Sequence, residues 1–180
     1  MERLIEMIEE VKAEGESLLV FTQFTELGSA LEKYIKQTLH YNTYYIHGGT
    51  SREKRERMIS EFQDPESEPS VFILSLKAGG VGITLTKANH VFHFDRWWNP
   101  AVEDQATDRA FRIGQTKNVL VHKFVCRGTV EEKIDQLIES KRGLSQELLE
   151  GGAGALLTEM KDDELLKLVA LDLNKAMKEA

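Results

Sequence analysis

The sequence predicts an α/β fold in which a doubly wound parallel sheet carries helices on both faces, with a helical extension at the C-terminus. Short apolar runs of strand length alternate with segments whose apolar residues recur at helical spacing. Some of the runs are apolar at nearly every position, as strands covered on both faces are. This alternation predicts parallel strands joined by right-handed crossovers, with ligands at the carboxyl ends of the strands.

The first half of the chain contains two predicted strand and helix units. The run "SLLVFTQF" (17–24) has strand length, and residues 26–40 after it carry apolar side chains at helical spacing. The run "YYIHGG" (44–49) predicts a second strand. Thr50 and Glu53 then form the pattern of a capping box, which predicts that a helix begins at this point.

The second half repeats the alternation. "VFILS" (71–75) predicts a buried strand after a proline-containing loop. Asn99 and Pro100 suit the cap and first turn of a helix, and Thr129 with Glu132 forms a second capping box. The remaining elements are predicted as strands over 90–94 and 119–126 and helices over about 100–113, 130–150 and 162–178. We expect one domain over residues 1–150 and a helical extension over 151–180.

The composition indicates an intracellular protein with a single core. At 180 residues, 41% of them hydrophobic, the chain has enough apolar material for one core. No apolar run is long enough to cross a membrane, and the charged N-terminus is unlike a signal peptide. The single cysteine, Cys126, excludes a disulfide framework. We therefore expect no membrane partner, and a location in the cytoplasm or nucleoid of a microbe or in the nucleus of a eukaryote.

The net charge of −7 is unevenly distributed along the chain. Residues 1–16 carry six acidic and two basic side chains, a balance of −4, whereas residues 96–127 carry six basic and three acidic ones, a balance of +3. Because the attraction of a polyanion depends on the local field, an acidic total is compatible with a basic face.

Gln105, Arg109 and Arg112 present an amide and two guanidinium groups within eight residues. Their spacing puts them on one face of the predicted helix, where guanidinium groups suit phosphate oxygens. The alternative is a surface pair between Arg112 and Asp108, which contributes about 0.2–0.5 kcal/mol. A glycine two residues after Arg112 ends the predicted helix. Arg112 therefore lies near the helix terminus, where its side chain can reach outward to another domain or molecule.

Two predicted loops at strand ends contain glycines beside basic side chains or histidine. In "SLKAGGVG", Gly80 and Gly82 permit close approach of the backbone to a phosphate or another chain, and Lys77 adds positive charge. In "HGGTSREKR", His47 and two glycines precede a helix N-terminus, an arrangement suited to an anion. The alternative for the first cluster is a plain tight turn. The alternative for the basic run of the second, Arg52, Lys54, Arg55 and Arg57, is a solvated helix face balanced by Glu53 and Glu56.

Two adjacent tryptophans, Trp97 and Trp98, follow the predicted strand over 90–94 in "FDRWWNP". Neighbouring tryptophans cannot easily both face one core, so we expect one to be buried and the other to stack or wedge against nucleic acid. Packing of the second ring on a neighbouring helix is the alternative.

The sequence predicts no metal site and lacks the usual means of gripping a nucleotide. His90 and His93 fall on opposite faces of a strand, which argues against closed zinc geometry with His122 and Cys126. The loop G-x-x-x-x-G-K-[ST] and an acidic box for magnesium do not occur. Arginines that act across an interface on a nucleotide bound elsewhere would reconcile these observations.

Four segments resemble motifs IV to VI of the Swi/Snf-type DNA translocase ATPases of helicase superfamily 2, in order and in spacing. They are "LLVFTQF", "YIHGGTSREKRERMISEFQ", "ILSLKAGGVGITLTKANHVFHFDRWWNP" and "QATDRAFRIGQ". The resemblance covers about residues 1–140 and implies the second, C-terminal RecA-like lobe of such an enzyme. It also implies that the helix after Thr129 is a brace toward the first lobe, and "LTEMKDDELLKLVALD" resembles the tail of microbial members.

The resemblance implies roles for individual residues. Gln105, Arg109 and Arg112 match motif VI, whose arginines complete the ATP site from the second lobe. Gly80 and Gly82 match motif V beside the nucleotide. The positions that match family contacts to DNA are Thr22, Gln23, His47, Gly48, Gly49, Ser75, Lys77 and Trp98. Phe111 departs from the histidine that is common in motif VI.

The resemblance thus implies one half of a double-stranded-DNA-dependent ATPase, a translocase of the chromatin-remodelling type. ATP with Mg²⁺ is expected to be held mainly by an N-terminal lobe of the same polypeptide, so the isolated chain is expected to hold no cofactor tightly and to be inactive. The expected partners are that lobe, double-stranded DNA and a DNA-bound protein. The alternatives are a non-catalytic module that docks protein or DNA, and a lobe of an RNA helicase.

Overall fold

The computed structural model describes residues 1–76, 83–97 and 100–141, together with Leu166 and Ala170. The chain divides into two compact units, of which the first contains residues 1–95 and 105–123 and the second contains residues 96–104 and the chain from 124 onward. The predicted extension over 151–180, apart from Leu166 and Ala170, lies outside the described residues, as does the predicted helix over 130–150 beyond residue 141.

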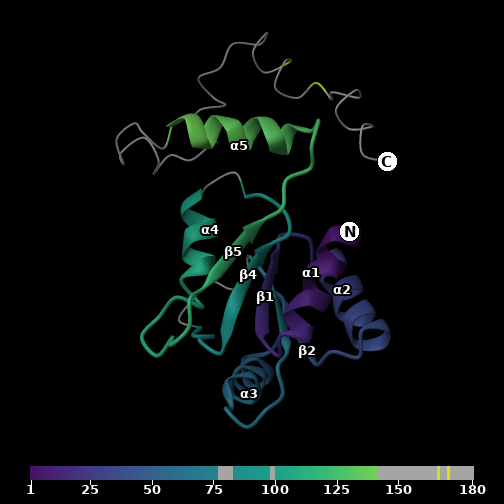
Figure 1. The fold of residues 1–180 in the computed structure, drawn as a ribbon, viewed down its shortest axis with the longest axis vertical. Helices are drawn as coiled ribbons and strands as arrows, with labels where there is room; N and C mark the ends of the chain where they lie inside the picture. The colour runs from purple at the N-terminus through teal and green to yellow at the C-terminus, as the bar shows by residue number, and fades with distance from the viewer. Residues whose placement is uncertain (77–82, 98–99, 142–165, 167–169, 171–180) are drawn as a thin grey trace. The chain divides into compact units, whose positions relative to one another are not determined.

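A parallel sheet of five strands, in the order β2-β3-β1-β4-β5, forms the centre of the first unit (Figure 1). The strands are β1 (Ser17–Thr22), β2 (Thr43–Ile46), β3 (Val71–Ser75), β4 (Ala88–His93) and β5 (Leu120–Lys123). The inner strands β3, β1 and β4 are buried along their whole length, as expected for parallel strands covered on both faces. The predicted doubly wound α/β fold is confirmed.

Three helices cover the two faces of this sheet. The helices are α1 (Glu2–Ala13), α2 (Thr25–Thr38) and α3 (Arg52–Gln63). Met58 and Phe62 of α3 pack in one cluster with Leu19 and Phe21 of β1. The intervening β1 residues point to the opposite face, because side chains alternate along a strand. On that face α1 contacts β1 and α2 contacts β2 and β3, and Figure 1 shows α1 and α2 side by side.

The N-terminal cap of α3 differs from the prediction by one residue. The cap is Ser51 rather than Thr50, and the Ser51 hydroxyl accepts from the N–H of Lys54. The hydroxyl of Thr50 instead accepts from the N–H of His47 at 3.1 Å and closes the turn after β2. The prediction failed because two adjacent residues can both cap a helix, and only the turn decides between them.

The predicted helix over 100–113 is wrong in its second half. Helix α4 (Pro100–Thr107) starts at the predicted proline but ends at Thr107. Arg109 and Ala110 then bond three residues back, in turn geometry, and the carbonyl of Arg109 accepts from the N–H of Leu85 at 2.9 Å. Gly114, at φ +105°, continues the turns. A hydrogen bond to a distant segment therefore replaces the last turns of the predicted helix.

In the second unit, helix α5 (Val130–Lys141) begins at the second predicted capping box. The Glu132 carboxylate accepts from the N–H of Gly128 at 3.0 Å, and the Thr129 hydroxyl accepts from the N–H of Glu131 at 3.3 Å. The second contact satisfies one of the N–H groups that a helix start leaves unpaired, and the first ties the chain before the helix to its first turn. Across both units, no helix of the described residues is long and apolar enough to cross a membrane.

Candidate functional site

The carboxyl edge of the sheet gathers most of the described residues that match DNA contacts. Thr22 and Ser75 are register partners at the ends of β1 and β3, and both are buried. Gln23 follows β1 and His47 follows β2, so they lie at the same edge, since parallel strands end together. Gly48 and Gly49, which follow His47, are exposed.

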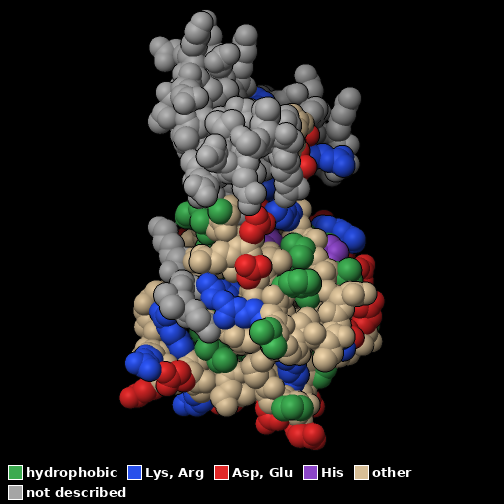
Figure 2. All heavy atoms as spheres, turned by 90° about the vertical axis from the view of Figure 1, so that its left-hand side faces the viewer, with side chains coloured by type: hydrophobic (Ala, Val, Ile, Leu, Met, Phe, Trp, Pro, Cys, Tyr) green, Lys and Arg blue, Asp and Glu red, His purple; other side chains and the backbone are tan. Residues whose placement is uncertain are grey.

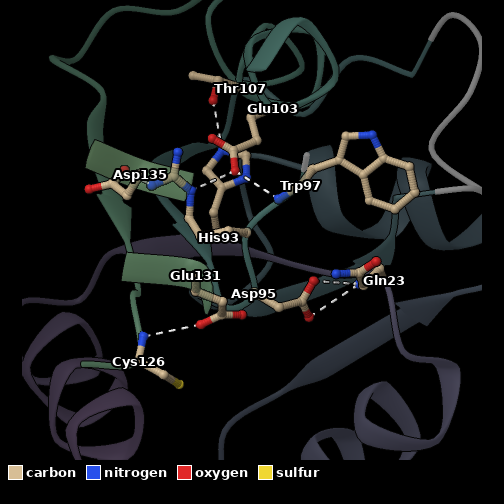
Figure 3. A network of polar contacts seen from close by, with 10 residues as sticks. Gln23, His93, Asp95, Trp97, Glu103, Thr107, Cys126, Glu131 and Asp135 are labelled. Atoms are coloured by element: carbon tan, nitrogen blue, oxygen red, sulfur yellow. Dashed lines mark hydrogen bonds and ion pairs between the residues drawn. The ribbon is translucent and has the colours of Figure 1, made fainter. Parts of the chain in front are cut away.

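Asp95 organises this edge, although the sequence pattern did not point to it. Its carboxylate accepts from the Thr22 hydroxyl at 2.5 Å. It also accepts from the N–H of Gln23 at 3.0 Å (Figure 3). Asp95 and Thr22 are both buried, so these bonds fix the start of the loop after β1. A carboxylate that directly follows an apolar strand was the available signal, because such a residue must lie at the ligand edge.

The turn after β2 is closed by its own polar groups. The N–H of Gly49 donates to Nδ1 of His47 at 3.1 Å, and the guanidinium of Arg55 donates to the carbonyls of Thr50 and His47. Because Nδ1 accepts, the proton of a neutral His47 ring lies on Nε2. The loop therefore presents a preset histidine donor beside the exposed Gly48.

Arg109 and Arg112 lie in the turns after α4 and contact one segment. The N–H of Leu85 donates to the Arg109 carbonyl, and Nη1 of Arg112 donates to the Thr84 hydroxyl at 3.3 Å. Residues 84–85 follow the loop that the sequence predicts around Gly80 and Gly82. The structure thus brings both arginines to the described end of that loop.

The two arginines differ in their surroundings. Arg109 is 3% exposed, and its guanidinium makes no hydrogen bond to any part of the chain that the structure describes. Burial lowers the pKa of Arg109, the positive charge of Arg112 lowers it further, and Asp108 opposes both effects. Arg112 is exposed, and within the described ranges no ion pair joins it to Asp108. Two guanidinium groups held close together in this way favour an anion between them.

Several predicted site residues are not joined to this arrangement. Gln105 is exposed in the last turn of α4, and no contact between described residues links it to either arginine. Its expected place on one helix face with them is wrong, because the helix ends before they are reached. Gly80, Gly82, Lys77 and Trp98 lie outside the described residues.

A groove of about 840 Å³ lies between α3 and residues 83–84. Its lining residues are Thr50, Arg52, Arg55, Glu56, Ile59, Ile83 and Thr84. Thr84 lines the groove and accepts from Arg112, so the groove and the arginine turns are continuous. On the face that Figure 2 shows, basic side chains lie in separate groups, with acidic ones near several of them. Any attraction of a polyanion is therefore local.

In the second unit, the segment before α4 is held by ion pairs. Nε of Arg96 donates to Oε1 of Glu103 at 2.8 Å, and the same oxygen accepts from the N–H of Trp97 at 3.0 Å (Figure 3). Trp97 is partly buried. In neither unit do the described residues place three His, Cys, Asp or Glu side chains to hold a metal ion.

Comparison with known proteins gives concordant matches. Residues 1–114 match the family of helicase conserved C-terminal domains. Over 171 residues, which are 95% of the chain, it is 43% identical to the putative ATP-dependent helicase/translocase YwqA of Bacillus subtilis. Over 147 residues, 81% of the chain, it is 39% identical to the human chromatin-remodeling ATPase INO80.

A solved structure resembles the chain in fold as well as in sequence. The SWI2/SNF2 ATPase core of Sulfolobus solfataricus in complex with dsDNA matches 95% of the chain with a TM-score of 0.78 and 43% identity. The chain covers 35% of that core, 18% of YwqA and 9% of INO80. It therefore corresponds to a minor part of each of these proteins.

Proposed function

Because the chain belongs to the helicase C-terminal domains of the SWI2/SNF2-type ATPases, we propose that it is the second lobe of a double-stranded-DNA-dependent translocase. ATP with Mg²⁺ is held mainly by an N-terminal lobe of the same polypeptide. This lobe supplies arginines to the nucleotide and contacts to the DNA backbone. A DNA-bound protein, as in chromatin remodelling, is the proposed object of translocation.

The pair of arginines carries this proposal. Arg112 is exposed and tethered to Thr84, so it can reach the γ-phosphate of a nucleotide presented by the other lobe. Arg109 is buried, and its positive charge adds to the attraction of the same phosphate. Guanidinium groups aimed at the charge that develops on the transferred phosphoryl group lower the barrier to hydrolysis. Gly80 and Gly82 are proposed to let the backbone approach the same phosphates.

The carboxyl edge of the sheet is the proposed DNA face. Side-chain and backbone donors of Gln23, His47 and the glycines after it suit phosphate oxygens, which position a protein on DNA without reading its sequence. Ser75, Lys77, Thr22 and Trp98 are proposed to contribute at the same edge. Asp95 supports this face through Thr22 and Gln23 rather than by touching DNA, since a carboxylate would repel phosphate.

The division of labour between two lobes has a direct consequence. The chain contains no phosphate-gripping loop. By itself it is therefore expected neither to hydrolyse ATP nor to bind it tightly. Robust turnover by the isolated chain would contradict the proposal.

The deciding experiment compares DNA-stimulated ATP hydrolysis by the full-length polypeptide with that of its Arg112→Ala variant. We expect turnover to fall about a thousandfold, as for a lost arginine finger, while ATP and DNA binding persist. The matched control is Arg57→Ala, which removes an exposed arginine that lies 3.8 Å from Glu61 on α3. Turnover of Arg112→Ala within a few-fold of the unmodified protein would leave the fold assignment intact and reject the catalytic role. Stronger stimulation by duplex RNA than by duplex DNA would instead favour an RNA helicase.

A further inference from the structure

The second unit contains a buried cation that the proposed mechanism does not use. The Arg96 side chain is 5% exposed and forms ion pairs with two carboxylates, Glu103 of α4 and Asp135 of α5. The Glu103 side chain is fully buried, at 0% exposed. A guanidinium is stable in such a place only when its charge is paired.

The same contacts bind the backbone beside the tryptophans. Oε1 of Glu103 accepts from Nε of Arg96 and from the N–H of Trp97, so one oxygen fixes a side chain and the next peptide group. In Figure 3 a dashed line joins Glu103 to the backbone of Trp97. The neighbouring residues 96–97 and α4 thereby meet α5, whose Asp135 lies 39 residues after Arg96, at one arginine.

We infer that Arg96, Glu103 and Asp135 form a clasp through which α5 positions the backbone at Trp97, the residue before Trp98 in the sequence. This inference rests on the proposed function insofar as Trp98 is a proposed DNA contact. Residues 96–104 and α5 belong to the same compact unit, whereas the arginines of the phosphate site belong to the other. The clasp residues are positioning residues, because they act on DNA only through the tryptophan segment.

The energetics of a buried ion pair favour a positioning role over a purely stabilising one. Removing charges from water costs several kcal/mol, roughly what their mutual attraction returns, so such pairs often add little net stability. Their geometry is nevertheless strict, since a displaced partner leaves an uncompensated charge. The clasp therefore selects one path for the backbone at Trp97, at little gain in overall stability.

Tryptophan fluorescence tests the clasp in the 180-residue chain itself. Both tryptophans of the sequence lie in this segment, so the emission reports on it alone. We expect acrylamide to quench the tryptophan emission of Asp135→Ala more strongly than that of the unmodified chain. The far-ultraviolet circular dichroism should be unchanged. Asp104→Ala, which removes an exposed acid of α4, is the matched control and leaves the quenching unchanged. Equal quenching of Asp135→Ala and unmodified protein would overturn the inference.

The DNA dependence of ATP hydrolysis by the full-length polypeptide tests the functional consequence of the clasp. We expect Asp135→Ala to raise about tenfold the DNA concentration that gives half-maximal ATPase stimulation, as for the loss of one charge-assisted bond. The kcat at saturating DNA and the KM for ATP stay within about twofold, unlike those of a destabilised protein, and Asp135→Glu recovers part of the loss. A fall in kcat with an unchanged DNA requirement would contradict the clasp. If the unmodified polypeptide shows no DNA-stimulated ATPase, the proposed function fails while the fluorescence result still decides the clasp.

Discussion

The two ends of α4 are held by different kinds of interaction. The first end is fixed by charge, through Glu103 and its bonds to Arg96 and Trp97. The second end is fixed by apolar packing, since Ala106 of the helix and Ala110 of the turn that follows it lie in the core of the sheet. We therefore expect the charged end to be most sensitive to a change of charge and the apolar end to a change of volume. A helix of eight residues can therefore link a tryptophan segment and an arginine turn that respond to different substitutions.

The largest expected effect comes from breaking the charged end. Glu103→Ala leaves the guanidinium of Arg96 short of one partner and the N–H of Trp97 unpaired, which we expect to lower the free energy of unfolding by about 3–5 kcal/mol. Urea unfolding of the chain measures this change. Asp104→Ala, one residue away and exposed, should change it by less than about 0.5 kcal/mol. A loss below about 1 kcal/mol for Glu103→Ala would mean that water or Asp135 replaces the missing carboxylate.

A smaller effect is expected from overfilling the apolar end. Ala110 is fully buried against the sheet, so Ala110→Leu should cost about 1–3 kcal/mol through overpacking. Ala101→Leu, at an exposed position in the first turn of α4, is the control and should be nearly neutral. If both substitutions cost the same in urea unfolding, packing does not distinguish the two ends.

The smallest effect concerns the turn that follows the apolar end. Gly114 has φ +105°, and a Cβ there would touch only the Thr86 hydroxyl at 3.8 Å, so the cost of Gly114→Ala is one of backbone conformation. We expect about 1–2 kcal/mol. Gly48→Ala provides the comparison, because its added Cβ meets no atom within 4 Å and its φ is not in the strained range. Thermal unfolding of the two variants should separate them by several degrees, and coincident curves would show that the turn relaxes.

The sequence predicted those parts of the fold that depend on local pattern. The run at 71–75 is β3 to the residue, and Pro100 begins α4, because apolar continuity and proline geometry act locally. The length of α4 was mispredicted because the bond that ends it comes from Leu85, which no pattern around residue 109 reveals. The cap of α3 was mispredicted for a similar reason, since Thr50 is engaged by the turn before it.

In the candidate site, too, some features follow from the sequence pattern and others only from tertiary contacts. Thr22 and Ser75 could be placed at one edge because parallel strands end together. Asp95 was missed, since its role depends on a bond to Gln23 made 72 residues away in sequence. The clasp was missed as well, because Asp135 lies 39 residues from Arg96. Pairings of this kind depend on tertiary structure and leave no periodic trace in the chain.

The central position of β1 affects how the chain is made. Leu18 pairs with Val71 on one side and with His90 on the other, so β1 leaves the ribosome long before either partner strand exists. At usual synthesis rates the delay before β3 follows is roughly 3–10 s. During this interval an apolar strand with two open edges is exposed, which favours aggregation and binding by chaperones. The strand that later anchors the ligand edge is therefore the part of the nascent chain that most needs protection.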